Sequence, residues 1–279
     1  MNKKVFFITG SSTGFGWHLA EESLKQGHKV IATARTISKL NSLVEQYREN
    51  ILPLTLDVTN IAQIRQSVKL GLETFGRIDV LINNAGYGLI GAVEEVSRDE
   101  IEKQFSTNVF APVEIIQEIL PTMRANKSGH IINISSIVGF TAYSGTSMYA
   151  ASKHAIEGIS QALAQEVEEF GIHVSVINPG PFRTNFAGSS LNLAKEKIDA
   201  YAQSVHLKQD IMKNKVDGSQ VGDPKAAALA ILSLTQMDNP PFTLPLGKFA
   251  YDESKRIFIS KLDEIEKFKK IGLPTDFED

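Results

Sequence analysis

The chain begins with a short apolar run that leads directly into a glycine-rich turn. Val5–Thr9 is typical of a strand buried on both faces of a sheet. The turn Thr9-Gly10-Ser-Ser-Thr-Gly14-Phe-Gly16 follows, and then the helical stretch Trp17–Gln26. Glycines at such a turn let the backbone approach a pyrophosphate, and the helix N-terminus offers free N–H groups. The GxxxGxG spacing differs from the general GxGxxG and also suits a plain tight connection, but its place in the first βα unit favours a dinucleotide site.

Short apolar runs recur along the chain and alternate with stretches of helical periodicity. Further strands are expected at Lys29–Ala34, Ile51–Leu56, Asp79–Ile82, Gly129–Ser135, Ile172–Asn178 and Phe242–Leu246. Helices are expected at Ser38–Glu49, Asn60–Phe75, Ser97–Arg124, Ser147–Phe170, Asp223–Gln236 and 252–270. The alternation predicts an α/β fold with a parallel sheet, and no repeat or low-complexity linker interrupts it.

We therefore expect a single domain over residues 1–279. Two segments depart from the regular pattern. Residues 185–222 are polar and irregular, with one plausible helix near Asn192–Val205, and are interpreted as an insertion that forms a substrate loop. Residues of about 249–279 are amphipathic and form a C-terminal helical extension.

Composition excludes several classes of protein. A net charge of −3 argues against a nucleic-acid binder, which carries a strongly basic face. The first apolar run is too short for a signal peptide, and no run approaches the ~20 residues that cross a bilayer, so no membrane partner is expected. The chain has no cysteine, which fits a cytoplasmic location. Its histidines form no i, i+4 pair and no cluster with carboxylates, so no metal site is expected.

The end of the second expected strand bears on the choice of dinucleotide. An NAD site places an Asp or Glu there to bind the ribose 2′-hydroxyl. This chain has no acidic residue between Lys29 and Val44 and has Arg35 instead. The planar guanidinium suits a 2′-phosphate, which predicts NADP(H); the alternative is a solvated arginine at a strand end.

A tyrosine and a lysine lie one helical turn apart at Tyr149-Ala-Ala-Ser-Lys153. A free phenol loses its proton near pH ~10, and a neighbouring cation favours the phenolate, so the pair suits general acid–base chemistry. Ser136 follows the strand expected before it, where its hydroxyl could polarise a carbonyl oxygen. A chance YxxxK on an exposed helix is the alternative, and the dinucleotide site upstream argues against it.

Asn108 falls on the apolar stripe of the helix expected at Ser97–Arg124. A buried amide costs free energy unless it is hydrogen-bonded, and Pro112 removes a backbone hydrogen bond to residue 108. We expect a kink with a hydrogen-bonded Asn108, which serves either the broken helix or the chemistry.

These motifs occur in a fixed order, which also includes Asn83-Asn84-Ala85-Gly86 and Asn178-Pro179-Gly180. The chain thereby resembles the single-domain branch of the short-chain dehydrogenases/reductases over roughly residues 3–185. The resemblance implies a Rossmann-type, doubly wound parallel sheet of about seven strands in a three-layer αβα arrangement.

The resemblance also implies roles for a catalytic set. Tyr149 would exchange a proton with the substrate oxygen, and Ser136 would hold that oxygen. Lys153 would hold the nicotinamide ribose and lower the pKa of the phenol, and Asn108 would support a water in a proton relay. Asp57 would contact the adenine, Asn84 to Gly86 the adenosine ribose, and Pro179, Gly180 and Phe182 the carboxamide side of the nicotinamide. The cofactor contacts expected are Gly10, Ser12, Thr13, Gly14, Phe15, Gly16, Arg35, Asp57, Val58, Asn84, Ala85, Gly86, Tyr149, Lys153, Pro179, Gly180, Phe182 and Thr184.

The main functional hypothesis is an NADP(H)-dependent carbonyl reductase or alcohol dehydrogenase. The first alternative is a dinucleotide-sensing regulatory protein, which typically lacks the Tyr or the Lys that this chain keeps. The second is a sugar-nucleotide epimerase or dehydratase, against which the GxxxGxG spacing and the lack of a large C-terminal substrate domain argue.

Substrate and assembly are predicted from apolar side chains. An aromatic set is expected around the Ser136–Tyr149 pair: Tyr87, Phe140, Tyr143, Phe182 and Phe186. Such a set favours an apolar ketone or secondary alcohol as the substrate. The alternative is that these rings belong only to the hydrophobic core. A homodimer is expected through the outer faces of the helices at Ser97–Arg124 and Ser147–Phe170, with Val113, Ile116 and Leu120 as contacts. The amphipathic tail could extend that interface or cover it.

Overall fold

A computed structural model describes residues 3–186, 188, 190–211 and 218–277. Its centre is a seven-stranded sheet in the order β3-β2-β1-β4-β6-β7-β9, and every neighbouring pair is parallel. The strands are β1 (Val5–Ile8), β2 (Lys29–Ala34), β3 (Ile51–Thr55), β4 (Val80–Asn83), β6 (Gly129–Ile134), β7 (Ile172–Pro179) and β9 (Thr243–Leu246). All seven lie within about a residue of the expected positions, and the Rossmann-type fold is confirmed.

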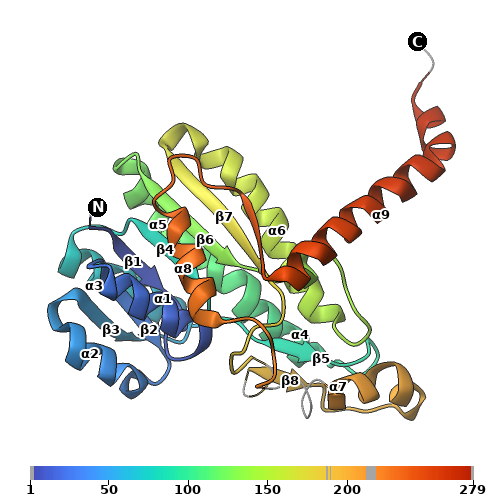
Figure 1. Cartoon of the computed structure of the whole chain (residues 1–279), viewed down its shortest axis with the longest axis horizontal. Helices are drawn as coiled ribbons and strands as arrows, with labels where there is room; N and C mark the ends of the chain where they lie inside the picture. Colours follow the sequence, from blue (N-terminus) through green and yellow to red (C-terminus); the bar gives the residue numbers. More distant parts are fainter. Residues whose placement is uncertain (1–2, 187, 189, 212–217, 278–279) are drawn as a thin grey trace.

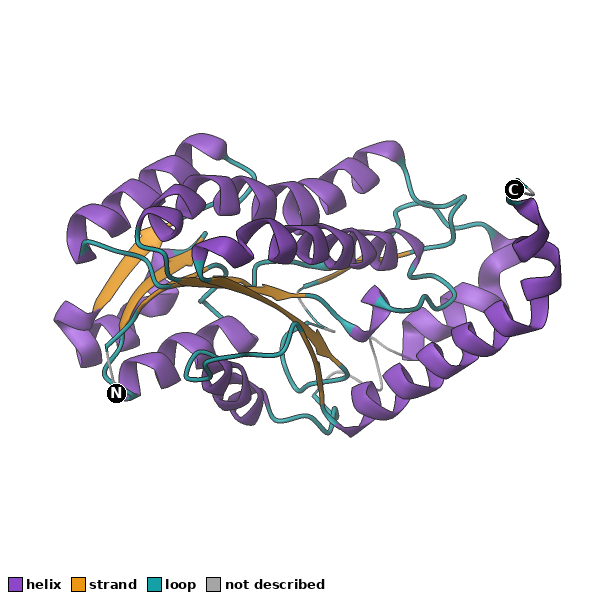
Figure 2. Ribbon diagram, turned by 90° about the horizontal axis from the view of Figure 1, so that it is seen from above, coloured by secondary structure: helices purple, strands orange, loops and turns teal. Residues whose placement is uncertain are grey.

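Helices cover both faces of the sheet, so the molecule has three layers (Figures 1 and 2). One core cluster joins one face of the sheet to α1 (Gly14–Lys25), α2 (Asn41–Tyr47) and α8 (Pro224–Leu234). The other cluster joins the opposite face to α3 (Ile61–Phe75), α5 (Ala111–Ala125) and α6 (Ser147–Val167). Strands buried on both faces are the reason that these segments are almost entirely apolar.

Two helix starts follow the capping residues in the sequence. The Asn60 side chain accepts a hydrogen bond from the Gln63 N–H at the start of α3. Ser97 and Glu100 form a complete capping box at the start of α4 (Arg98–Phe105). The helix expected at Ser97–Arg124 is interrupted after α4 by a π-helical turn at Ser106–Phe110, and α5 follows it. Pro112 lacks the N–H that would bond to residue 108, which explains the break.

The insertion differs from its sequence prediction. Instead of a helix near Asn192–Val205, the chain forms the short strand β8 (Leu191–Leu193), which pairs in parallel with β5 (Gly88–Ile90). Helical turns begin only afterwards, at Asp199–Tyr201 and Ala202–His206, and lead into α7 (Leu207–Ile211). Pairing with a strand about a hundred residues away decides the conformation here, and helical periodicity within the segment does not reveal it.

The outer-face contacts proposed for a dimer also need correction. Ile116 is 5% exposed and belongs to the core cluster formed with the sheet, and Leu120 packs against the same cluster. Ile116 is therefore a core residue of its own chain and not an interface residue. The homodimer itself stays a prediction.

The last helix, α9 (Lys248–Gly272), packs on the body through its first half, where Lys261 donates a 3.0 Å hydrogen bond to the Phe140 carbonyl, and then projects from it (Figures 1 and 2). Within the described residues, no helix combines the length and the apolar character that crossing a bilayer requires.

Candidate active site

The carboxyl ends of four neighbouring strands carry most of the predicted site. β1 leads into the glycine-rich turn, and β4 leads into Asn84 to Gly86. Ser136 follows β6, and Gly180 follows β7. Because β1, β4, β6 and β7 are parallel neighbours in the sheet, these segments meet at one edge, where open α/β sheets bind their ligands.

The glycine-rich turn is held by the segment after β4. The Asn84 amide donates hydrogen bonds to the carbonyls of Thr9 (2.8 Å) and Gly10 (3.2 Å). The Thr9 hydroxyl accepts from the backbone N–H groups of Asn84 (2.9 Å) and Ala85 (3.0 Å). The Asn84 side chain therefore shapes the turn, whereas the sequence prediction assigned it to the adenosine ribose.

Two glycines of the turn are required by its geometry. Gly10 has φ +69°, in the left-handed region that side chains rarely adopt. A Cβ on Gly16 would lie 2.2 Å from the Gly10 carbonyl oxygen and 2.5 Å from Asn84 Nδ2. Thr13 makes no side-chain capping bond at the start of α1, so its side chain leaves the N–H groups of the first turn free. A glycine turn whose backbone is accessible, followed by a helix N-terminus without a side-chain cap, offers N–H groups that can bind a pyrophosphate.

Tyr149 and Lys153 are buried on the first turns of α6. The Lys153 ammonium donates a 2.7 Å hydrogen bond to the Ile134 carbonyl at the end of β6 and lies 5.9 Å from the centre of the Tyr149 ring. The Ser136 hydroxyl lies near the Tyr149 phenol and acts to lower its pKa. The predicted Ser–Tyr–Lys set is therefore together in space.

Burial shifts the pKa of both groups towards the uncharged form. It raises the pKa of Tyr149 to about 12, against the smaller, lowering effect of the Ser136 hydroxyl. It lowers the pKa of Lys153 to about 8, and the charge of Glu157 opposes that shift. At neutral pH the phenol is protonated and the lysine is mostly an ammonium.

Asn108 lies at the π-helical turn, as the kink prediction required, and is fully hydrogen-bonded. Its amide donates to the Tyr87 carbonyl (2.9 Å) and the Ser152 hydroxyl (3.2 Å), and its oxygen accepts from the Tyr87 N–H (3.1 Å). Gly86 lies between this side chain and Lys153, since a Cβ there would be 3.2 Å from Asn108 Oδ1 and 3.8 Å from Lys153 Nζ. Asn108 thus joins the α4–α5 bend to α6 beside the catalytic set.

Arg35 is exposed at the end of β2, and its charge contributes to lowering the pKa of Asp57 at the end of β3. The larger cause is the hydrogen bonding of the Asp57 carboxylate, which accepts from the Thr59 hydroxyl (2.8 Å) and N–H (3.0 Å). Val58 beside it is buried in the core cluster. The two charged side chains therefore lie at the same edge of the sheet as the glycine-rich turn.

The segment after β7 folds over the glycine-rich turn. The Phe182 ring packs edge-on against Phe15 at 5.1 Å, and a Cβ on Gly14 would lie 3.3 Å from the Thr184 side chain. The Gly180 N–H donates to the Leu246 carbonyl (3.1 Å), which fixes this segment to β9. The predicted contacts from both segments thus lie side by side at the carboxyl edge of the sheet.

The contacts of four of the five aromatic residues divide them into three groups. Phe186 lies 5.6 Å from the Tyr149 ring and packs against the apolar cluster that contains Tyr149. Phe140 belongs to that cluster as well, but its ring packs against Phe258 of α9 at 5.1 Å, and the Tyr143 hydroxyl donates to Glu253 of that helix at 3.0 Å. The Phe182 ring packs on Phe15. Among the described contacts between rings, Phe186 is therefore the one ring of this set that lies directly against Tyr149.

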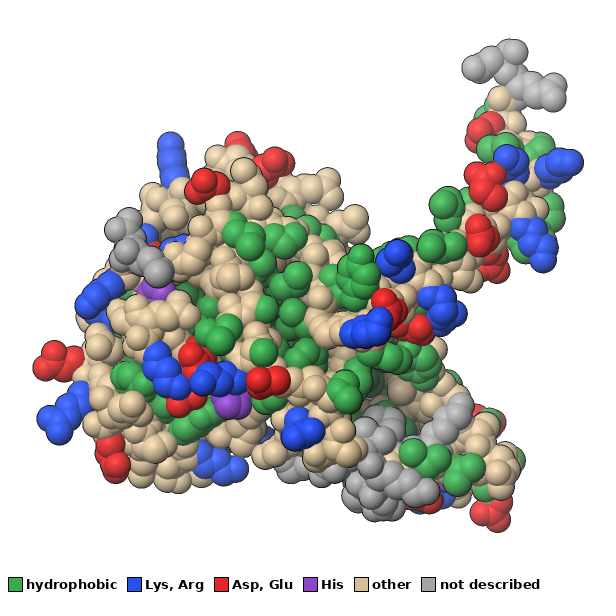
Figure 3. Space-filling view, viewed as in Figure 1, with side chains coloured by type: hydrophobic (Ala, Val, Ile, Leu, Met, Phe, Trp, Pro, Cys, Tyr) green, Lys and Arg blue, Asp and Glu red, His purple; other side chains and the backbone are tan. Residues whose placement is uncertain are grey.

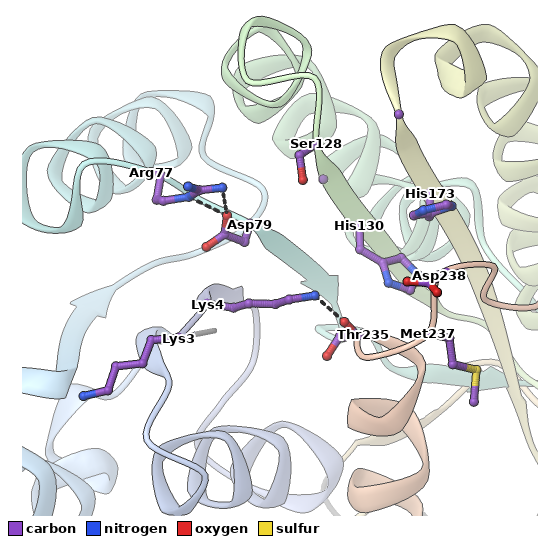
Figure 4. A pocket seen from close by; sticks show the side chains of 12 residues that line it. Lys3, Lys4, Arg77, Asp79, Ser128, His130, His173, Thr235, Met237 and Asp238 are labelled. Atoms are coloured by element: carbon purple, nitrogen blue, oxygen red, sulfur yellow. Dashed lines mark hydrogen bonds and ion pairs between the residues drawn. The ribbon is translucent and has the colours of Figure 1, made fainter. Parts of the chain in front are cut away.

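A separate polar cavity of about 530 Å³ lies at the opposite, amino-terminal edge of the strands (Figure 4). Arg77 and Asp79 in it form an ion pair at 2.5 Å, and the Lys4 ammonium bonds the Thr235 carbonyl. Burial lowers the pKa of His130 in it to about 3, so this histidine is neutral. The cavity holds none of the predicted site residues and lies at the strand end where such sheets do not bind their ligands.

Comparison with known proteins assigns to a family both this fold and the residues at the carboxyl edge of its sheet. The family description "short chain dehydrogenase" matches residues 4–193, which include the glycine-rich turn, Asn108, Ser136, Tyr149 and Lys153. The chain belongs to the short-chain dehydrogenase/reductase family. It is thereby an oxidoreductase with a nicotinamide dinucleotide as its cofactor.

Several relatives are similar to this chain over most or nearly all of its length. Oxidoreductase BOA17 of Botryotinia fuckeliana is 38% identical over 98% of this chain and 99% of its own length. The 3-ketodihydrosphingosine reductase of Bacteroides thetaiotaomicron is 37% identical over 88% of this chain and 89% of its own. A short-chain dehydrogenase of Streptomyces avermitilis has a similar structure, with a TM-score of 0.93, 38% identity and 99% and 100% coverage of the two chains.

Structures of more distant relatives contain either dinucleotide. ElxO with NADP bound has a TM-score of 0.71 and 28% identity, covering 88% of this chain and 97% of its own. A short-chain dehydrogenase of Burkholderia phymatum in complex with NAD shares the fold at 23% identity and a TM-score of 0.77, covering 100% and 97% of the two chains. The comparisons therefore leave open which dinucleotide this dehydrogenase prefers.

Glu157 is part of the site in this dehydrogenase and was missed in the sequence. It lies one turn after Lys153 on α6 and accepts a 2.6 Å hydrogen bond from the Asn178 amide on β7. Burial raises its pKa, and the charge of Lys153 acts in the opposite direction. The spacing of four residues between Lys153 and Glu157 could have indicated that the two side chains interact, but the same spacing is common on exposed helices. Its contact with Asn178 required the tertiary structure.

Glu157→Gln is expected to lower the pKa of Lys153 further below about 8, because it removes the negative charge that favours the ammonium. A lysine is charged below its pKa, so activity should fall more near pH 8 than near pH 6. NMR titration of ¹³C-labelled lysine measures the shift. Glu166→Gln, an exposed change on the same helix, is the control and should leave the pKa unchanged. An unshifted Lys153 in Glu157→Gln would contradict the coupling.

Proposed function

We propose that this short-chain dehydrogenase transfers a hydride between NADP(H) and a carbonyl or secondary alcohol, with Tyr149 as proton donor and acceptor. The observation that carries the proposal is the Ser136–Tyr149 hydroxyl pair beside the buried Lys153 ammonium. The dinucleotide would supply the hydride at this edge. Side chains of this protein would bind the substrate oxygen and transfer the proton.

The arrangement assigns each side chain a distinct role. The Ser136 hydroxyl would donate to the substrate oxygen, and the adjacent phenol, which is protonated at neutral pH, would give that oxygen its proton. Lys153 would stabilise the phenolate that remains. Asn108 holds the Tyr87 backbone and the Ser152 hydroxyl, and would support a water for reprotonation. A phenol that is protonated at neutral pH can donate that proton to the oxygen of a carbonyl substrate.

The same cleft would hold the dinucleotide. Its pyrophosphate would lie on the N–H groups at Ser12 and Thr13, among the glycines of the turn. Asp57 and Val58 would receive the adenine, and Ala85 and Gly86 the adenosine ribose. Pro179, Gly180, Phe182 and Thr184 would line the nicotinamide side, close to Tyr149 and Lys153. Arg35 would bind the 2′-phosphate, which is the basis for preferring NADP(H).

We propose an apolar substrate that enters between the Ser136–Tyr149 pair and the insertion at residues 185–222. Phe186 of that insertion lies against the Tyr149 ring, and Leu191 and Leu193 belong to the strand that covers β5. A relative at 37% identity is named 3-ketodihydrosphingosine reductase, which agrees with a ketone as the substrate. The insertion would act as the substrate loop of a single domain at residues 1–279, with 249–279 as its extension. We place the enzyme in the cytoplasm because a chain without cysteine suits a reducing compartment.

Tyr149→Phe should reduce kcat on the order of 10²-fold or more while dinucleotide binding stays near normal. The change deletes the proton donor and almost no volume. Steady-state kinetics and a fluorescence titration with NADPH measure the two effects. Tyr47→Phe, on α2 and outside the cleft, is the control and should keep full activity. A near-normal rate for Tyr149→Phe would remove the phenol from the mechanism.

Arg35→Asp should reverse a preference for NADPH over NADH. A carboxylate at this position repels the 2′-phosphate and accepts a ribose hydroxyl. The ratio of kcat/KM for the two cofactors is the measurement. Lys39→Asp makes the same change of charge at an exposed position nearby and should keep the wild-type preference. A wild-type enzyme that prefers NADH would refute the assignment of Arg35.

A further inference from the structure

Helix α9 leaves the body of the protein after its first turns. Its buried residues are Ala250, Ser254 and Ile257, and residues 258–277 are all exposed. Figures 1 and 3 show it as an arm that projects away from the rest of the molecule. Helices in proteins owe most of their stability to the packing of an amphipathic face, and residues 258–277 make little such packing with the described part of the chain. The arm therefore needs a surface to cover it.

Apolar side chains run along the arm on its solvent side. Phe258, Leu262 and Ile265 follow one another at spacings of four and three residues, and Tyr251 lies one heptad before Phe258. We call this set the arm stripe, and its members are Tyr251, Phe258, Ile259, Leu262, Ile265, Phe268 and Leu273. Each of the seven is between 48% and 69% exposed. Figure 3 shows these apolar atoms along the arm between charged side chains.

An apolar groove continues the arm stripe onto the body. It has a volume of about 380 Å³ and is lined by Pro245, Tyr251, Ser254, Lys255, Phe258 and Ile259. The groove and the stripe share three residues, so they form one surface from the root of α9 towards its tip. A partner that covered the stripe would also fill the groove.

We propose that the arm stripe packs antiparallel against the arm stripe of a second copy of this chain. The charges along one edge of the stripe fit this arrangement. Asp252, Lys255, Glu266 and Lys270 lie on that edge, at positions that follow the helical repeat. With the two-fold axis near Lys261, Lys255 of each copy lies opposite Glu266 of the other, and Asp252 lies opposite Lys270. Symmetry makes each contact twice.

The same register places apolar surface against apolar surface. The tip of one arm, with Phe268 and Leu273, would lie over the groove at the root of the other, beside Pro245 and Tyr251. Seven half-exposed apolar side chains at about 100 Å² each give roughly 700 Å² per copy, close to the area of a standard stable interface. The two bodies lie at opposite ends of the helix pair. This interface is separate from the α5 and α6 faces.

The charge pattern favours a second copy over a lipid surface. A helix that lies on a membrane carries a mainly basic polar face. The distal half of the arm instead mixes Asp263, Glu264 and Glu266 with lysines. Alternating charges of both signs beside an apolar stripe are typical of helix–helix pairing.

Light scattering of the full-length protein at micromolar concentration tests the pairing. Ile265→Glu places a charge in the middle of the stripe and should halve the measured mass, whereas the rest of the protein should unfold at the wild-type temperature. Asp263→Lys changes an exposed charge on the side of the helix away from Phe258 and Ile265, and should leave the mass unchanged. A wild-type mass of 30.6 kDa, or an Ile265→Glu variant of unchanged mass, would overturn the proposal.

Charge reversal tests the register. Lys255→Glu should raise the dissociation constant more than ten-fold, and the double variant Lys255→Glu/Glu266→Lys should restore it. The two positions are eleven residues apart on one helix, about 16 Å, so they cannot pair within a chain. Failure of the double variant to restore association would refute this antiparallel register. The alternative outcome is a monomeric wild type that floats with anionic phosphatidylserine vesicles, together with an Ile265→Glu variant that does not float. That result would show that the arm stripe binds a membrane instead of a second copy.

Discussion

The hydrogen bond from the Lys153 ammonium to the Ile134 carbonyl ties helix α6 to the end of strand β6. Ser136 lies two residues after that carbonyl, and Tyr149 lies one helical turn before that lysine. One contact of 2.7 Å therefore sets the distance between the two hydroxyl groups that would meet the substrate oxygen. Asn108 and Glu157 bind the same region from two sides, through Ser152 and Asn178. The site is a rigid junction of helix and strand ends rather than a loop.

Burial of this junction explains its electrostatics. The phenol and the lysine are both shifted towards their neutral forms, with pKa values of about 12 and about 8. A buried phenol with a raised pKa keeps its proton at neutral pH and is ready to donate it, and the ammonium beside it is ready to stabilise the anion that forms. This combination suits the reduction of a carbonyl. It also requires that polar side chains be hydrogen-bonded inside the protein, which Asn108 achieves with three hydrogen bonds to Tyr87 and Ser152.

Much of the fold could be predicted from local sequence signals. Strand β2 begins and ends at the expected residues, and Asn60 and Ser97 start their helices as their side chains indicated. Three features depended on distant contacts and could not. Strands β5 and β8 have three residues each and pair across about a hundred residues. Ile116 fits the pattern of an outer face yet is buried, because it lies four residues after Pro112 and three before Ile119 on the face that packs on the sheet. Glu157 shows its role only once β7 lies beside α6.

The most direct test of the proposed function follows the hydride itself. NADPH deuterated at the nicotinamide C4 position that donates should be incubated with the enzyme and a panel of apolar ketones, and the alcohol examined by mass spectrometry. The account predicts an alcohol with one deuterium on its carbinol carbon, and a slower rate than with unlabelled NADPH when transfer limits turnover. Turnover that produces an alcohol without deuterium, from a cofactor shown to be labelled on both faces, would contradict direct hydride transfer at the Ser136–Tyr149 pair.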